Sequence, residues 1–158
     1  MEINTLFDEG LEGCLEESWL ENVVEKVLVA QGIDSSAEVG LVIVGQKRVR
    51  QLNLSYLGKD EPTDVLAFSM LPEQSGRDLA PFVVAPDGIK HLGEVIISYP
   101  QAAIQAEEHQ HSIKMEIAIL VIHGVLHLLG YEHDKPELER EMRAREAEIL
   151  SNIEEELK

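Results

Sequence analysis

The sequence predicts an α+β domain in which a mixed sheet of about four strands is flanked by helices, with a metal site on a core helix and the turn after it. The chain has 158 residues, which suits one compact domain. Several short apolar runs have the length and the β-branched content of strands. One later stretch, IAILVIHGVLHLL, is apolar on every side, as a helix in a protein core is. We therefore expect a single domain over residues 1–158.

The first half of the chain alternates strand and helix patterns. A weak strand is plausible over Glu2 to Leu6. Apolar residues at helical spacing from Leu15 to Leu28, with Gly32 as a stop, predict an amphipathic helix. The run VGLVIV over 39–44 is too short for a buried helix and predicts a central strand. A second helix is expected over about Gln46 to Tyr56.

The second half becomes increasingly helical. Two further strands are expected over 63–70 and 92–98, each approached through turn-forming residues. The connection 72–91 is rich in proline and glycine and is expected to carry a small hairpin at PFVV or to act as a lid. Helices are then predicted from Pro100 to about His109 and from Ser112 to Leu129.

A last helix begins near Pro136, because Asp134 and Glu137 stand at capping-box spacing around this proline. No apolar run approaches the ~20 residues that cross a bilayer, and the first residues lack a basic signal-peptide head. The protein is expected to be soluble and cytoplasmic. Cys14 is the only cysteine, so a metal would have to be held by His, Asp or Glu.

Charge is strongly acidic and unevenly spread. The formal net charge of −17 would repel nucleic acid at long range. Lys47, Arg48, Arg50 and Lys59 nevertheless follow one another with no acid among them. This segment is interpreted either as a solvated basic helix or as a small positive patch on an acidic protein.

Three of the six histidines lie in HGVLHLLGYEH, residues 123 to 133. On a helix, His123 and His127 project from the same face about one turn apart, so both imidazoles can reach one tetrahedral ion. Gly130 can end that helix with a positive φ and turn the chain back to bring in His133. The alternative is a set of hydrogen-bonded core histidines, which explains the glycine stop poorly. The sequence therefore predicts a metal site at His123, His127 and His133.

Three protein ligands leave one position of a zinc ion open, and such a site is catalytic rather than structural. The spacing matches the ligands of metzincin peptidases, HExxHxxGxxH. Those enzymes use the glutamate after the first histidine as general base, and here that residue is Gly124. Glu116 or Glu132 could in principle replace it, but neither has the peptidase position. Proteolysis is thus a minor alternative.

The chain resembles the YbeY family of bacterial metal-dependent endoribonucleases. The family signature HGxLHLxGYDH appears as HGVLHLLGYEH, with Glu132 in place of Asp. LNLSYLGKDEPTDVLAF, from Leu52 to Phe68, resembles the family's LNxxYRxKDxPTDVLSF, and LGEVIIS from Leu92 resembles LGDIxIS. The three blocks occur in order between about residues 40 and 135.

The resemblance implies one Zn²⁺ per chain, bound by His123, His127 and His133. It also implies a zinc-dependent, single-strand-specific endoribonuclease acting in ribosomal RNA maturation and ribosome quality control. The expected partners are ribosomal RNA or its precursor. The acidic charge of the chain adds the basic proteins of the small ribosomal subunit as a second expectation; no membrane and no DNA are expected.

One departure from the family bears on activity. Leu57 stands where the family has an arginine thought to help handle RNA phosphate, and leucine can neither donate hydrogen bonds nor compensate phosphate charge. Arg50 or Lys59 would supply the lost charge, or the chain is a ribosome-assembly or RNA-binding factor with little cleavage. Thr63 and Asp64 match the family block but suit a structural role in the loop before the strand equally well. No catalytic residue is assigned.

Overall fold

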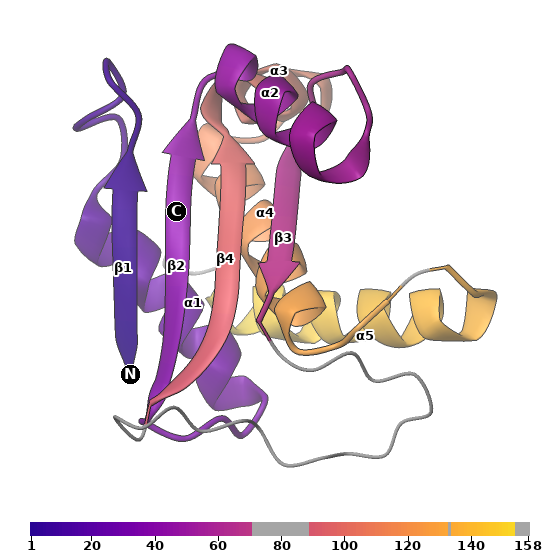
Figure 1. The fold of residues 1–158 in the computed structure, drawn as a ribbon. Coiled ribbons are helices and arrows are strands. Elements are labelled where there is room, and N and C mark those ends of the chain that lie inside the picture. The colour runs from indigo at the N-terminus through magenta and orange to yellow at the C-terminus, as the bar shows by residue number, and fades with distance from the viewer. Residues whose placement is uncertain (71–88, 133, 154–158) are drawn as a thin grey trace.

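The computed structural model describes residues 1–70, 89–132 and 134–153, which form four strands and five helices (Figure 1). In chain order they are β1 (Glu2–Phe7), α1 (Glu17–Ala30), β2 (Ala37–Val44), α2 (Gln46–Leu57), β3 (Val65–Ser69), β4 (Lys90–Ser98), α3 (Tyr99–Glu108), α4 (Ile113–Leu128) and α5 (Pro136–Ile153). The predicted α+β class is confirmed. The hairpin or lid predicted over 72–91 falls mostly on residues 71–88, outside the described residues.

The strands form one mixed sheet in the order β1-β2-β4-β3. β1 and β4 pair parallel to β2, whereas β3 runs antiparallel to β4. β2 therefore lies inside the sheet, as its uninterrupted apolar run predicts. Its residues Val39, Leu41 and Ile43 are fully buried.

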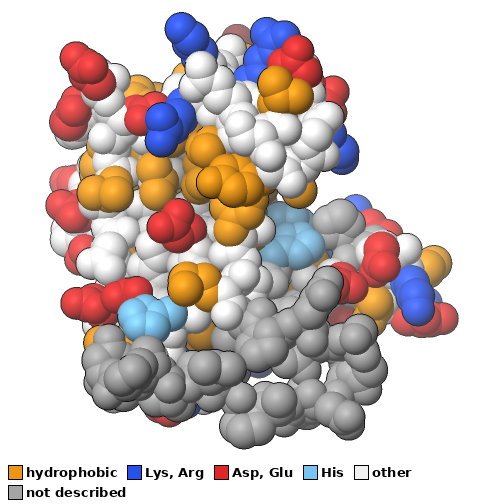
Figure 2. Space-filling model, viewed as in Figure 1, with side chains coloured by type: hydrophobic (Ala, Val, Ile, Leu, Met, Phe, Trp, Pro, Cys, Tyr) orange, Lys and Arg blue, Asp and Glu red, His pale blue; other side chains and the backbone are white. Residues whose placement is uncertain are grey.

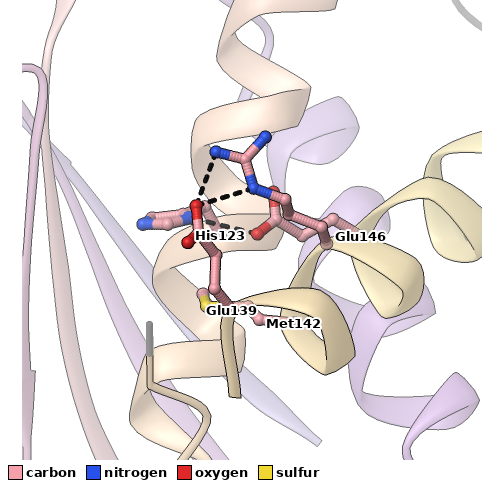
Figure 3. A pocket seen from close by; sticks show the side chains of 5 residues that line it. His123, Glu139, Met142 and Glu146 are labelled. Atoms are coloured by element: carbon pink, nitrogen blue, oxygen red, sulfur yellow. Dashed lines mark hydrogen bonds and ion pairs between the residues drawn. The ribbon is translucent and has the colours of Figure 1, made fainter. Parts of the chain in front are cut away.

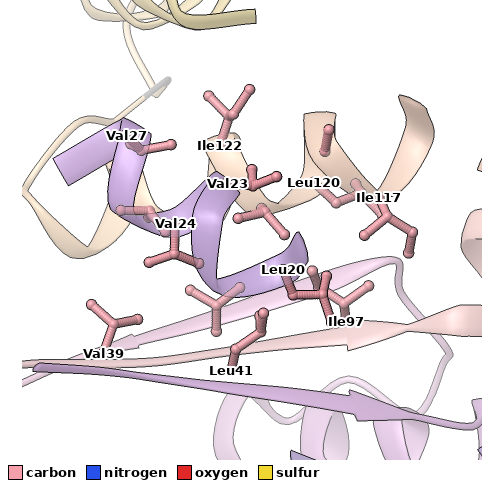
Figure 4. Close-up of a cluster of buried hydrophobic side chains, with 14 of the residues drawn as sticks. Leu20, Val23, Val24, Val27, Val39, Leu41, Ile97, Ile117, Leu120 and Ile122 are labelled. Atoms are coloured by element: carbon pink, nitrogen blue, oxygen red, sulfur yellow. The ribbon is translucent and has the colours of Figure 1, made fainter. Parts of the chain in front are cut away.

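The main core lies between one face of the sheet and the helices α1 and α4 (Figure 4). Leu20 and Val24 of α1 and Ile117 of α4 are fully shielded from solvent, together with Leu41 and Ile97 of the sheet. A smaller cluster on the other face lies under α2 and contains Val44, Val49, Leu66 and Ile96. Helix α4 contacts α1, α3, α5, β3 and β4, which makes it the central helix of the fold.

A β-bulge interrupts the pairing of β2 with β4. Glu38 pairs with His91 and Val39 with Gly93, so Leu92 is an extra residue. Gly93 has φ +133, and a Cβ there would lie 2.1 Å from the carbonyl oxygen of Phe68. The glycine of LGEVIIS thus allows β3 to approach β4 closely.

No single helix among the described residues is long and apolar enough to cross a membrane. α3 and α4 pass that test only as a pair, and they are bent by 115° relative to each other.

Candidate metal centre

His123 and His127 lie side by side on α4. Ser112 caps this helix by accepting a hydrogen bond from the backbone N–H of Met115 at 3.1 Å. The imidazole centroids of the two histidines are 4.6 Å apart and the rings are nearly perpendicular. Both side chains are half-buried, whereas most of α4 is buried. His123 and His127 therefore lie together in the structure, as their spacing of four residues on a helix predicts.

The turn after α4 has the conformation that the sequence predicts. Gly130 has φ +102, a value that favours glycine, and its backbone N–H donates to the carbonyl oxygen of His127. Tyr131 donates its backbone N–H to Leu126 and accepts a hydrogen bond at its hydroxyl from Gln31 Nε2 at 2.9 Å. The tyrosine of the motif thus anchors the turn to the end of α1. His133 lies outside the described residues, so its place as a third ligand stays a prediction.

A pocket of about 310 Å³ opens beside His123, between α4 and α5 (Figure 3). Its lining includes Glu139, Arg143 and Glu146 of α5. The Oε1 atom of Glu146 lies 3.2 Å from Nδ1 of His123. A carboxylate only accepts hydrogen bonds when ionised, so Nδ1 is the protonated nitrogen of this pair. Arg143 donates its Nε–H to Glu139 at 3.0 Å.

Gly124 is a packing residue. It is buried, and a Cβ at this position would lie 2.5 Å from Cγ1 of Val95 on β4. This distance is far below normal contact, so α4 can lie this close to the sheet only without a side chain here. A glutamate that served as a peptidase base would have to occupy the apolar contact between helix and sheet. Contact with β4 therefore disfavours a glutamate, and with it a peptidase base, at this position.

Glu116 cannot substitute for that base. It lies seven residues before His123, roughly 10 Å along the helix axis, and is 2% exposed. Its Oε1 accepts from His109 and His111, and its Oε2 accepts from Gln105. Burial raises the pKa of Glu116, but the hydrogen bonds from His109, His111 and Gln105 together hold this pKa below its usual value. The ligand atoms of His109, His111 and Glu116 all lie within 4.8 Å of one another and could hold a metal ion.

The basic segment forms α2 and the turn after it. Arg50 donates to both carboxylate oxygens of Asp60, at 2.8 and 3.2 Å, so it is already engaged. Lys47, Arg48 and Lys59 are exposed. Leu57 is 55% exposed at the end of the helix and stands next to Tyr56, whose ring packs on Phe68. Figure 2 shows hydrophobic side chains gathered on this face beside a group of histidine side chains.

Thr63 and Asp64 hold the loop before β3. The Thr63 hydroxyl lies 3.4 Å from Asp64 Oδ1, and Gln105 Nε2 donates to Asp64 Oδ2 at 3.3 Å. The backbone carbonyl of Asp64 accepts from Ser98. These contacts favour the structural interpretation of both residues.

Comparison with known proteins decides the family. The family model described as Endoribonuclease YbeY matches residues 12–154. The chain belongs to the YbeY family. A Dehalococcoides mccartyi protein named Endoribonuclease YbeY is 45% identical over 98% of this chain and 91% of its own length. The YbeY endoribonuclease of Moorella thermoacetica is 43% identical over 86% of this chain and 85% of its own. The solution structure of a Thermotoga maritima protein shares the fold, with a TM-score of 0.59 and 23% identity over 98% of this chain and 93% of the other.

Membership of the YbeY family makes the chain an enzyme of a hydrolase class, with residues able to hold a metal ion. Sequence reasoning identified the histidine pair but missed Glu146 and Arg143, which line the pocket beside His123. Both lie in a glutamate-rich and arginine-rich helix. No spacing in that helix singles these two residues out.

Proposed function

We propose that this YbeY protein is a zinc-dependent, single-strand-specific endoribonuclease that acts on ribosomal RNA or its precursor in the cytoplasm, in ribosomal RNA maturation and ribosome quality control. The supporting observation is the pair His123 and His127 on the core helix. Both side chains are half-buried, their ring centroids are 4.6 Å apart, and His123 lines a pocket. The names of the relatives supply the reaction class.

The residues present fit a zinc ion. His123 donates Nδ1–H to Glu146, which orients its ring and makes Nε2 the nitrogen that would coordinate the metal. His127 would be the second ligand and His133 the third. The ion, when bound, would supply a nucleophilic hydroxide near neutral pH or polarise a phosphate oxygen. Glu146 keeps His123 in the tautomer that coordination requires.

Arg143 is the guanidinium best placed to contact the scissile phosphate, because it lines the same pocket as His123. Guanidinium groups bind phosphate through paired hydrogen bonds. This assignment supplies the charge that Leu57 lacks. Both arginines pair with a carboxylate, Arg143 with Glu139 and Arg50 with Asp60, but Arg143 is the one that lines the pocket beside His123. In the free protein, Glu139 holds Arg143 in place through the Nε–H bond.

Replacing Arg143 with alanine is expected to raise KM for RNA about tenfold, since a hydrogen bond between charged groups contributes about 1.5 kcal/mol or more. Steady-state cleavage of a labelled single-stranded RNA measures this. Arg140→Ala is the matched control, because Arg140 is exposed on the same helix but does not line the pocket. Equal KM values for the two variants would exclude the role of Arg143.

Because the chain carries a net charge of −17, RNA would bind only at a small surface where exposed cations gather. Lys47, Arg48 and Lys59 are the exposed cations of α2 and its following turn, and they suit contacts to the phosphate backbone. Such binding weakens steeply as salt rises. Basic proteins of the small ribosomal subunit would be attracted to the acidic remainder of the surface. Neither DNA nor a membrane is proposed as a partner.

The experiment that tests this function offers the purified protein four substrates: precursor ribosomal RNA, its duplex form, single-stranded DNA and an unfolded polypeptide. Cleavage of single-stranded RNA alone, stopped by a chelator, is the expected result. Leu57→Arg is expected to increase that cleavage severalfold, because Leu57 is exposed and occupies the arginine position of the family motif LNxxYRxKDxPTDVLSF, which this chain resembles.

The alternative is an assembly factor that binds RNA without cutting it, and exposed Leu57 is the observation that favours it. That alternative predicts RNA binding by wild type with cleavage appearing only in Leu57→Arg. Cleavage of the polypeptide would instead restore the peptidase interpretation.

A further inference from the structure

Three potential ligands meet where α3 turns into α4, far from the histidine pair. His109 ends α3, His111 lies in the turn, and Glu116 lies in the first turn of α4. His109 Nδ1 is 3.1 Å and His111 Nε2 is 2.6 Å from the same atom, Glu116 Oε1. We call these three residues the α3–α4 cluster.

The backbone of the turn is bent so that both histidines face the carboxylate. The residue between them, Gln110, has φ +56 and is the one non-glycine residue with a positive φ in the described part of the chain. Residues with a side chain rarely adopt this left-handed conformation, because it brings Cβ close to the backbone. Histidines two positions apart would point in different directions in a regular helix, whereas here they converge on Glu116.

A hydrogen bond to the second oxygen of the Glu116 carboxylate fixes its orientation. Gln105 Nε2 donates to Glu116 Oε2 at 2.9 Å, so Oε1 is the oxygen that faces the imidazoles. In metal sites, a hydrogen bond from a neighbouring side chain to a ligating carboxylate holds that carboxylate in the orientation needed to bind the metal. Glu116 is buried, and its described hydrogen-bond partners are His109, His111 and Gln105, none of them a lysine or arginine. A divalent cation held by the two imidazoles would place a permanent positive charge beside this buried carboxylate.

Access and ligand type also fit a metal. His109 is 57% exposed and His111 26%, so an ion can enter from solvent and keep water ligands. Two imidazoles and one carboxylate form a ligand set that zinc and neighbouring transition metals use. Around an ion with bonds of roughly 2.1 Å, tetrahedral ligand atoms are about 3.4 Å apart. Each imidazole nitrogen would therefore have to move away from Glu116 Oε1 by less than about 1 Å.

We propose that His109, His111 and Glu116 form a second site for a divalent transition metal of the zinc type, independent of the one on His123 and His127. The seven residues between Glu116 and His123 put the two sites roughly 10 Å apart along α4, too far to share one ion. The second ion ties α3 to α4 across their 115° bend. Through Gln105, which also donates to Asp64, it braces the loop before β3.

The test measures zinc per chain by elemental analysis, after chelator treatment, reloading with zinc and desalting. The background is the His123→Ala, His127→Ala double variant, so that the site of the proposed function is removed. This background is expected to retain about one zinc per chain. Adding His109→Ala is expected to abolish retention, and adding Glu116→Gln to do the same.

His91→Ala is the matched control, because His91 forms a comparable pair with Glu38 at 2.7 Å outside the cluster. It is expected to leave the zinc content unchanged. His109 is exposed, so its loss should not unfold the chain, and circular dichroism of each variant checks this. The melting temperature should rise with zinc in the background protein and stay constant in His109→Ala.

A background protein that retains no zinc, or one that retains it equally after His109→Ala, overturns the second site. Neither result bears on the proposed nuclease, because RNA cleavage is assayed separately in the wild type. The His109→Ala variant with its other histidines intact is expected to cleave RNA as wild type does.

Discussion

Replacing Gly93 with alanine is expected to lower the free energy of unfolding by about 3 kcal/mol or more. Gly93 has φ +133, which residues with a side chain rarely adopt, and its Cβ would lie 2.1 Å from the carbonyl oxygen of Phe68. The obstructing atom belongs to the backbone of the paired strand β3, so it cannot rotate away. Relief requires β3 to separate from β4. Urea denaturation followed by circular dichroism measures the loss.

Gly40→Ala is the matched control, because Gly40 lies in the neighbouring strand β2. A Cβ there would meet the Glu94 side chain at 3.0 Å, and that side chain is exposed and free to move. The expected loss is no more than about 1 kcal/mol. Similar destabilisation by both substitutions would show that the bulge at Gly93 does not control the pairing of β3 with β4.

Replacing His127 with alanine is expected to slow RNA cleavage about 10³-fold, which corresponds to ~4 kcal/mol of lost transition-state stabilisation. The substitution removes one imidazole of the pair and leaves the rest of α4 intact. His127 is half-buried and its ring packs against that of His123, so the fold should survive the loss of this side chain. Single-turnover cleavage of a labelled RNA measures the effect.

The control for His127→Ala is again His91→Ala, which removes an imidazole from β4 outside both histidine groups. It is expected to cleave RNA at the wild-type rate. A His127→Ala variant that retains its fold and more than about a tenth of wild-type cleavage would exclude His127 as a ligand of the catalytic metal.

Much of the fold follows from local patterns. The run VGLVIV is a buried central strand because its apolar side chains are covered on both faces, and the all-apolar stretch forms the central helix α4. The strand order and the bulge at Gly93 depend on contacts between segments distant in sequence. The sequence marks Gly93 only as one glycine within a strand.

In the candidate site too, some residues follow from local sequence patterns and others depend on tertiary packing. His123 and His127 are predictable because helix geometry alone places residues four apart on one face. Glu146 and Arg143 come from α5, and only tertiary packing brings them to His123. From the sequence, Gly124 indicates only that the glutamate of the metzincin motif is absent. The structure shows that close contact with Val95 requires a glycine here. The α3–α4 cluster depends on the unusual backbone of Gln110, which no residue pattern indicates.

The most direct test of a metal-dependent nuclease centred on His123 and His127 is a zinc titration of chelator-treated protein, with the rate of single-stranded RNA cleavage as readout. Wild type is expected to lose cleavage on chelation and to regain it as zinc is added. The His123→Ala, His127→Ala double variant is expected to stay inactive at every zinc concentration. Cleavage by wild type that survives chelation, or cleavage that zinc restores in the double variant, would contradict the account.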